Sequence, residues 1–115
     1  MSTRLLVTKE SHQRSVTVRA VGEVDVSTVL DLAVDVEHAC ARAEAALVVV
    51  DLRYVTFLGA SGIALLDSAA RRCSQHGTTL RVLAHDRVVL RPLRMMGVDQ
   101  KLMLVVTDGE AIGTG

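Results

Sequence analysis

The chain has 115 residues, of which 50% are hydrophobic and only 2% aromatic, and its 13 basic residues balance 13 acidic ones. This length suits one domain with a single aliphatic core. The balanced charge and the scarcity of aromatic rings argue against a nucleic-acid surface. The sequence has no apolar run near the roughly 20 residues that cross a bilayer, and no signal-peptide pattern at its start. We therefore expect a cytoplasmic protein with neither a nucleic-acid nor a membrane partner.

The first quarter of the sequence predicts an antiparallel hairpin. Residues 4–10 and 14–22 are expected to be its strands, because apolar and polar residues alternate along the second of them. A short polar segment connects the two strands. The loop that follows contains two candidate helix caps, Asp25 and Ser27.

The rest of the chain alternates between helical and strand patterns. We expect a helix over 28–43, a central strand covered on both faces over 47–52, a second helix that ends before Gly77, a strand over 79–85, a third helix over 87–97, and a short strand or helical turn over 101–106. In the third helix, Pro92 marks either a kink or the first turn of its regular part.

This order of elements predicts a single α/β domain. A hairpin followed by right-handed crossovers gives a mixed sheet of four to five strands with helices packed against it. We expect the domain to occupy residues 1–115, with a core over about 5–106 and a flexible tail over 107–115.

The sequence contains no catalytic or metal-binding pattern. The four histidines lie in unlike elements with no shared spacing: His12, His38, His76 and His85. Neither an HExxH motif nor a Cys/His metal spacing occurs, so we expect no catalytic residue, metal or cofactor. Cys40 and Cys73 fall on the apolar stripes of two helices. They are either small buried hydrophobes or, if the helices are neighbours, a redox pair.

A small-residue corner, FLGASG at 57–62, separates the central strand from the second helix. It resembles a hydrolase nucleophile elbow, but Gly62 is not where the second glycine of GxSxG stands. A phosphate-binding P-loop is also absent, because no GK[ST] follows. The residues alone favour a helix cap at Ser61. A tight turn and a close approach by another molecule both remain open explanations of the glycines.

Three segments together resemble the STAS domain of bacterial anti-sigma-factor antagonists: VRAVGEVDVSTVLDL, LVVVDLRYVTFLGASGIALL and GTTLRVLAHDRVVLRPLRMMGVD. The resemblance spans about residues 5–106. It implies a binding protein rather than an enzyme. Its partner would be an anti-sigma factor, a serine kinase of the histidine-kinase-like ATPase fold, and binding would release a sigma factor. The kinase would phosphorylate a serine at the corner to reverse the binding.

The corner departs from the family pattern of Asp-Ser-Ser/Thr-Gly. Gly59 stands at the position of the acid and Ala60 at that of the usual phosphoacceptor, so the standard hydroxyl is missing. Ser61 matches the neighbouring residue, which is not the usual acceptor. We therefore predict binding without conventional phosphoregulation at Ala60. Phosphorylation of Ser61 remains the alternative, and abundance, another ligand or the cysteines would supply the regulation.

The predicted partner surface joins the first loop to the corner. Its residues are Gly22, Glu23, Asp25, Arg53, Gly59, Ala60, Ser61 and Gly62. For the glycines and Asp25, the alternative is a purely structural role in turns and capping. Two other functions remain open: a STAS subunit that docks on the ATPase of an ABC-type lipid-transport complex, and a small hydrolase that uses Ser61. We expect a monomer or a weak homodimer.

Overall fold

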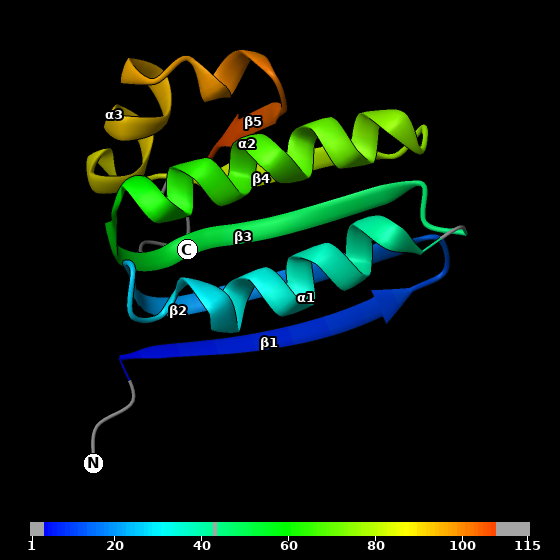
Figure 1. The fold of residues 1–115 in the computed structure, drawn as a ribbon, viewed down its shortest axis with the longest axis horizontal. Helices are drawn as coiled ribbons and strands as arrows, with labels where there is room; N and C mark the ends of the chain where they lie inside the picture. The colour runs from blue at the N-terminus through cyan, green and yellow to red at the C-terminus, as the bar shows by residue number, and fades with distance from the viewer. Residues whose placement is uncertain (1–3, 43, 108–115) are drawn as a thin grey trace.

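The computed structural model describes residues 4–42 and 44–107, and Figure 1 shows their arrangement. Five strands, three helices and a 3-10 turn follow one another in the order β1 (Leu5–His12), β2 (Ser15–Val24), α1 (Val29–Ala41), β3 (Leu47–Leu58), α2 (Ala60–Gln75), β4 (Thr79–Ala84), α3 (Arg87–Met95), η1 (Val98–Gln100) and β5 (Met103–Val106). The predicted α/β class and the mixed sheet are confirmed.

The strands form one sheet in the order β1-β2-β3-β4-β5. β1 runs antiparallel to β2 through the predicted hairpin, and the remaining neighbours are parallel. The alternation predicted for β2 is confirmed: Val16, Val18 and Ala20 are buried, whereas Arg19 between them is exposed. This alternation fixes which face of the sheet receives the helices.

The helices lie on one face of the sheet only. Each of the three crossovers steps to the next strand in the same direction, so right-handed connections carry all the helices to the same side. In Figure 1, α1 lies in front of β2 and α2 in front of β4, β3 is visible between these two helices, and α3 lies beyond α2. Helices therefore cover only one face of β3, but residues 48–52 are buried on both faces of the strand, as expected. Its central position is confirmed.

Several predicted boundaries shift in the structure. β3 continues six residues beyond 52, because it stays paired with β2 through two register shifts. The third helix begins at Arg87, where the Asp86 side chain accepts a hydrogen bond from Val88 N. Pro92 is therefore inside the helix, and the alternative that placed it in the first turn is wrong. The last segment is β5, a strand rather than a helical turn.

The core lies between the sheet and the helices. Its largest fully buried side chains are aliphatic, with Leu52 from β3, Leu32 from α1 and Leu66 from α2 among them. Except for Thr107, the tail expected over 107–115 lies outside the described residues, as does Ala43 at the end of the predicted first helix. Within 4–42 and 44–107, no helix is long and apolar enough to cross a membrane.

Candidate functional site

The corner between β3 and α2 lies directly beside the loop between β2 and α1. Gly59 N donates a hydrogen bond of 2.8 Å to Val24 O, which joins the two segments through their backbones. Parallel pairing of β2 with β3 brings both of their carboxyl ends to this edge of the sheet. The predicted proximity of the loop and the corner is confirmed.

Gly59 is the N-cap of α2, and the helix begins at Ala60. Backbone N–H groups of Gly62 and Ile63 donate to Gly59 O at 3.0 and 3.1 Å. Ala60 is exposed and Gly59 is half-buried, so this end of the helix presents almost no side chain to solvent. The surface of the corner is therefore neutral and low in relief.

The predicted cap at Ser61 is wrong. Ser61 is the second residue of α2, and the N-cap of this helix makes no side-chain hydrogen bond. Its Oγ is buried and has no hydrogen-bond partner in the described part of the chain. An N-cap hydroxyl must precede the helix to reach the N–H groups of the first turn. Ser61 lies two positions beyond the N-cap, Gly59, and so cannot take that role.

Two of the predicted surface glycines have a structural reason that does not involve a partner. At Gly22, φ is +122°, and a Cβ would lie 2.1 Å from the backbone oxygen of Arg4. Gly62 is buried, and a Cβ there would lie 2.6 Å from Leu58 Cδ1 and 2.8 Å from Val24 Cγ1. Gly22 lets β1 approach β2, and Gly62 lets α2 approach the sheet.

The loop between β2 and α1 is held by a polar network. Arg4 pairs with both Glu23 and Asp25, and Asp25 Oδ1 accepts hydrogen bonds from the backbone and hydroxyl of Ser27 at 2.9 and 2.7 Å. These bonds from Ser27, with the charge of Arg4, lower the pKa of Asp25. Thr28 is the N-cap of α1 and makes no side-chain cap, so capping by Asp25 or Ser27 is wrong. Asp25 shapes the loop instead.

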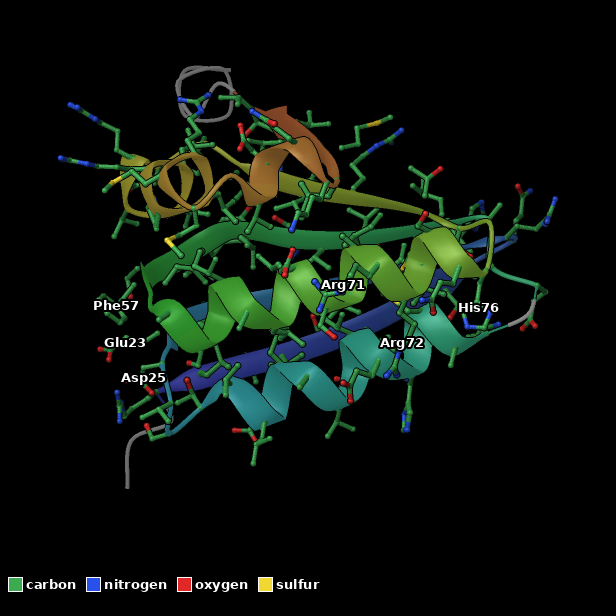
Figure 2. All side chains as sticks on the ribbon, turned by 45° about the horizontal axis from the view of Figure 1, so that its top comes forward. Glu23, Asp25, Phe57, Arg71, Arg72 and His76 are labelled. Atoms are coloured by element: carbon green, nitrogen blue, oxygen red, sulfur yellow. The ribbon has the colours of Figure 1, made fainter. Side chains whose placement is uncertain are left out.

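Figure 2 shows Glu23 and Asp25 at the same end of the molecule as Phe57, the exposed first residue of the corner. Phe57 pairs with Glu23 across the strands, and its side chain is 48% exposed. Sequence reasoning passed over this residue, because a lone phenylalanine in a strand pattern normally faces a core. Its pairing with Glu23 is set by the register of the folded sheet, so the sequence held no direct signal for it.

Arg53 lies away from the corner. Residues 53–59 span about 20 Å along a strand, at about 3.3 Å per residue. On the face of the sheet without helices, the Arg53 Nε and Nη2 atoms donate to Asp51 at 2.9 Å each. Arg19 reaches the same carboxylate at 3.0 Å. The structure therefore does not bring Arg53 together with the other predicted contact residues.

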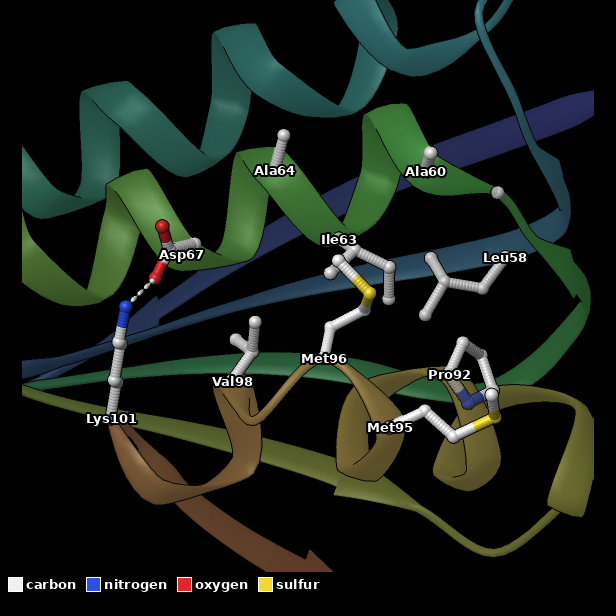
Figure 3. Close-up of a pocket in the computed structure, with 11 residues that line it drawn as sticks. Leu58, Ala60, Ile63, Ala64, Asp67, Pro92, Met95, Met96, Val98 and Lys101 are labelled. Atoms are coloured by element: carbon white, nitrogen blue, oxygen red, sulfur yellow. Dashed lines mark hydrogen bonds and ion pairs between the residues drawn. The ribbon is translucent and has the colours of Figure 1, made fainter.

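A groove between α2 and α3 adjoins the corner (Figure 3). Its volume is about 450 Å³, and Leu58, Gly59 and Ala60 form the end nearest the corner. At the other end, Lys101 Nζ is 2.9 Å from Asp67 Oδ1. The hydrogen bonds from Lys101 and Arg71 lower the pKa of Asp67. No motif in the sequence indicated this groove, because its walls come from segments that are distant along the chain.

Cys40 of α1 and Cys73 of α2 meet between the two helices. Both are free and fully buried, and their Sγ atoms are 2.6 Å apart. The contact with Cys73, followed by burial, raises the pKa of Cys40, whereas the hydrogen bond with Cys40 lowers that of Cys73. The predicted adjacency of the helices is confirmed, and redox activity stays a prediction.

The four histidines do not converge. His12, His38 and His76 are exposed and belong to different elements. Within the described residues, no group of three or more His, Cys, Asp or Glu side chains could hold a metal ion.

Comparison with known proteins assigns the family. The family model described as "Mlab, STAS domain" matches residues 7–106. The chain belongs to the STAS domain family. The anti-sigma-F factor antagonist RsfA of Mycobacterium tuberculosis is 30% identical to this STAS domain over 97% of the chain and 88% of the relative.

Solved structures agree with this STAS fold. An anti-sigma factor antagonist from Mycobacterium paratuberculosis has a TM-score of 0.81 at 24% identity, and the match covers 96% of this chain and 92% of that one. The antagonist SpoIIAA in its unphosphorylated form has a TM-score of 0.74 at 19% identity, with 93% of each chain covered. The expected STAS architecture is thereby confirmed.

Proposed function

We propose that this STAS domain is an anti-sigma-factor antagonist, which binds an anti-sigma factor and so releases a sigma factor for transcription. The observation that carries the proposal is the 30% identity, over nearly the whole chain, to a relative named as such an antagonist. The partner is expected to have the histidine-kinase-like ATPase fold. Binding, and not turnover, is the proposed activity, because the relative is named for its action on an anti-sigma factor.

The contact surface of the proposal is the corner with the adjoining loop. Gly59 and Ala60 supply a neutral, side-chain-poor platform, which the backbone of a partner can approach closely. Glu23 and Asp25 border this platform with negative charge, and Phe57 adds an exposed ring. A flat apolar centre with a charged rim is typical of protein interfaces. Gly22, Gly62 and Arg53 contribute to the fold beneath or beside this surface.

Phosphorylation does not control this surface in the proposed function. Ala60 has no hydroxyl, and the Oγ atom of Ser61 is buried, so a kinase would have to displace the start of α2 to reach it. A phosphate there would add nearly two negative charges next to Glu23 and Asp25. Phosphate mapping after incubation with the partner and ATP should find an unmodified corner. Stoichiometric phosphate on Ser61 would contradict this.

Ala60→Glu is the test of the contact surface. The partner is obtained by affinity purification with the unmodified chain, identified, and then expressed and purified. Glutamate at the first position of a helix favours the helix dipole, so the variant should fold normally. A charge buried at the interface should cost about 3 kcal/mol, which weakens binding about a hundredfold in calorimetry.

Two matched variants make the Ala60 result specific. Ala60→Gln adds similar bulk without charge and should lose less affinity than Ala60→Glu. Ala41→Glu places the same charge on the exposed last residue of α1 and should leave the affinity unchanged. Equal affinity of the Ala60→Glu variant and the unmodified chain would disprove the surface. Recovery of an ABC-type ATPase instead of an anti-sigma factor would favour the transport alternative.

Regulation by the cysteine pair is part of the proposal. Hydrogen peroxide oxidises one thiol to a sulfenic acid and releases water. The second thiol then attacks that sulfur, forms the disulfide and releases a second water. Peroxide treatment should remove two hydrogens from the intact mass and raise the melting temperature, and Cys73→Ser should show neither change. A chain that keeps both thiols, or that links only to other chains, would contradict the pairing.

A further inference from the structure

The groove between α2 and α3 is apolar, open and continuous with the corner. Ala60, Ile63 and Ala64 of α2 form one wall, and Pro92 and Met95 of α3, with Met96 directly after that helix, form the other, as Figure 3 shows. A volume of about 450 Å³ lies in the range of cavities that enclose a small molecule or several apolar side chains. Its one charged pair, Asp67 with Lys101, is already mutually satisfied.

Two methionines form the rim on the α3 side. Met95 and Met96 are 73% and 69% exposed, which is unusual for side chains of this size in a chain that buries most of its aliphatic residues. Methionine is flexible and polarisable, so it adapts its shape to an apolar partner. The rim therefore suits a protein segment that enters between the helices.

The charge beside this rim is positive. Arg87, Arg91 and Arg94 lie on one side of α3, where they line a smaller hollow with Met95. All three are exposed, and none has a carboxylate within ion-pair distance among the residues described in the structure. In contrast, Lys101 and Arg71 next to the groove both pair with Asp67. Three positive charges thus stand uncompensated along one edge of an apolar groove.

We propose that this groove receives an acidic amphipathic helix of the same anti-sigma factor that contacts the corner. The apolar side chains of that helix would lie between α2 and α3, and its carboxylates would face the three arginines. One partner is expected to cover both areas, because Gly59 and Ala60 belong to both. The inference rests on the function proposed above and adds the chemistry of the partner segment.

Other occupants fit the groove less well. A bilayer surface is too flat to enter a groove between two helices. A symmetric dimer through this face would bring two sets of unpaired arginines together, which like-charge repulsion disfavours. A small anionic amphiphile would have no free cation at the inner end, since Lys101 is paired.

The first test compares binding of the purified anti-sigma factor to charge and side-chain variants. Met96→Gln should weaken binding about tenfold, and the matched change Met103→Gln, at an exposed methionine of β5, should not. Arg91→Glu should also weaken binding about tenfold and flatten its salt dependence. Arg72→Glu, at an exposed arginine toward the other end of α2, is its control.

The second test identifies the segment directly. The chain is prepared with photoreactive methionine and irradiated in complex with the anti-sigma factor. Cross-links from Met95 or Met96 should map to one helix of the partner that is rich in apolar and acidic residues. Cross-links from Met103 alone, or to a basic segment, would overturn the proposal.

The remaining outcomes also decide the question. If Ala60→Glu abolishes binding while Met96→Gln and Arg91→Glu do not affect it, the groove proposal is wrong and the antagonist function stands. If no anti-sigma factor binds the unmodified chain, both proposals are wrong. Binding of anionic vesicles would indicate a lipid surface as the occupant and contradict the proposal. Self-association in sedimentation that Met96→Gln removes would indicate a second copy of the chain and would also contradict it.

Discussion

The open face of the sheet and the groove between α2 and α3 both expose apolar side chains, and they differ in how their charges are satisfied. On the open face of the sheet, Leu6 and Tyr54 are 55% and 42% exposed, but the neighbouring charges are paired among themselves. Beside the groove, the exposed methionines stand next to three arginines without a carboxylate partner in the described structure. Exposed apolar area alone does not identify a binding surface. Uncompensated charge next to a concave apolar surface is a stronger indication.

The open face is stabilised by its own contacts. Arg19 and Arg53 share Asp51, and their guanidinium groups lie 5.4 and 5.5 Å from the centre of the Tyr54 ring. Cation–π contacts and ion pairs of this kind keep long side chains flat on the sheet. A partner on this face would have to break them. The corner requires no such rearrangement, because Gly59 and Ala60 have no polar side-chain contacts to lose.

The largest effect is expected for Gly22→Ala, which separates the role of this glycine in folding from a role in binding. A Cβ would collide with the backbone oxygen of Arg4, and φ is +122°. We expect the free energy of unfolding to fall by about 3 kcal/mol or more in urea titrations. Gly77→Ala is the control: φ is +70° but nothing lies within 4 Å, so about 1 kcal/mol is expected. Equal losses would contradict the packing argument.

A smaller effect is expected for Asp51→Asn, which breaks the paired charges of the open face. The carboxylate is 1% exposed and accepts bonds from two arginines. Because Arg19 remains 44% exposed and can turn to solvent, the loss should be about 2 kcal/mol at pH 7. Affinity for the anti-sigma factor should not change. A loss of affinity equal to that of Ala60→Glu would move the interface to this face.

The same variant makes a prediction about pH. Burial by itself would raise the pKa of Asp51, but the hydrogen bonds and charge of Arg53, with Arg19, outweigh it and lower the pKa. Because the pKa of Asp51 is lower in the folded state than its unfolded value of about 4, the ionised carboxylate stabilises the fold at pH values above about 4. This stabilisation is lost as the pH falls through the pKa of the folded state. In the Asp51→Asn variant, the free energy of unfolding should therefore fall less steeply between pH 7 and pH 3 than in the unmodified chain. Asp31→Asn, at an exposed carboxylate, serves as control.

Much of the fold could be predicted because the apolar patterns of individual strands and helices match the faces that they bury in the folded domain. The alternation in β2 and the helical stripe of α1 both point to the observed core. The full length of β3 could not be predicted, since residues 53–58 mix polar and aromatic side chains and remain extended only through pairing with β2. Tertiary pairing, and not local preference, sets that boundary.

The candidate site was predicted in part. The proximity of the loop to the corner follows from parallel strands, and Gly59 with Val24 confirms it. The cap assigned to Ser61 was wrong because the helix starts at Ala60, two residues earlier than a cap at Ser61 requires. The sequence alone could not show whether Gly22 and Gly62 serve folding or binding, because this depends on which atoms a Cβ would contact. The groove was missed because only the fold brings Met96 to α2.

The central claim is that the partner covers the corner and not the open face. The most direct measurement is the backbone NMR spectrum of the isotope-labelled chain during titration with unlabelled anti-sigma factor. The account predicts that the largest shifts occur at Gly59, Ala60 and the adjoining loop, and continue into α3. Shifts confined to Leu6, Tyr54 and their neighbours on the open face, with an unchanged Ala60 amide, would contradict it.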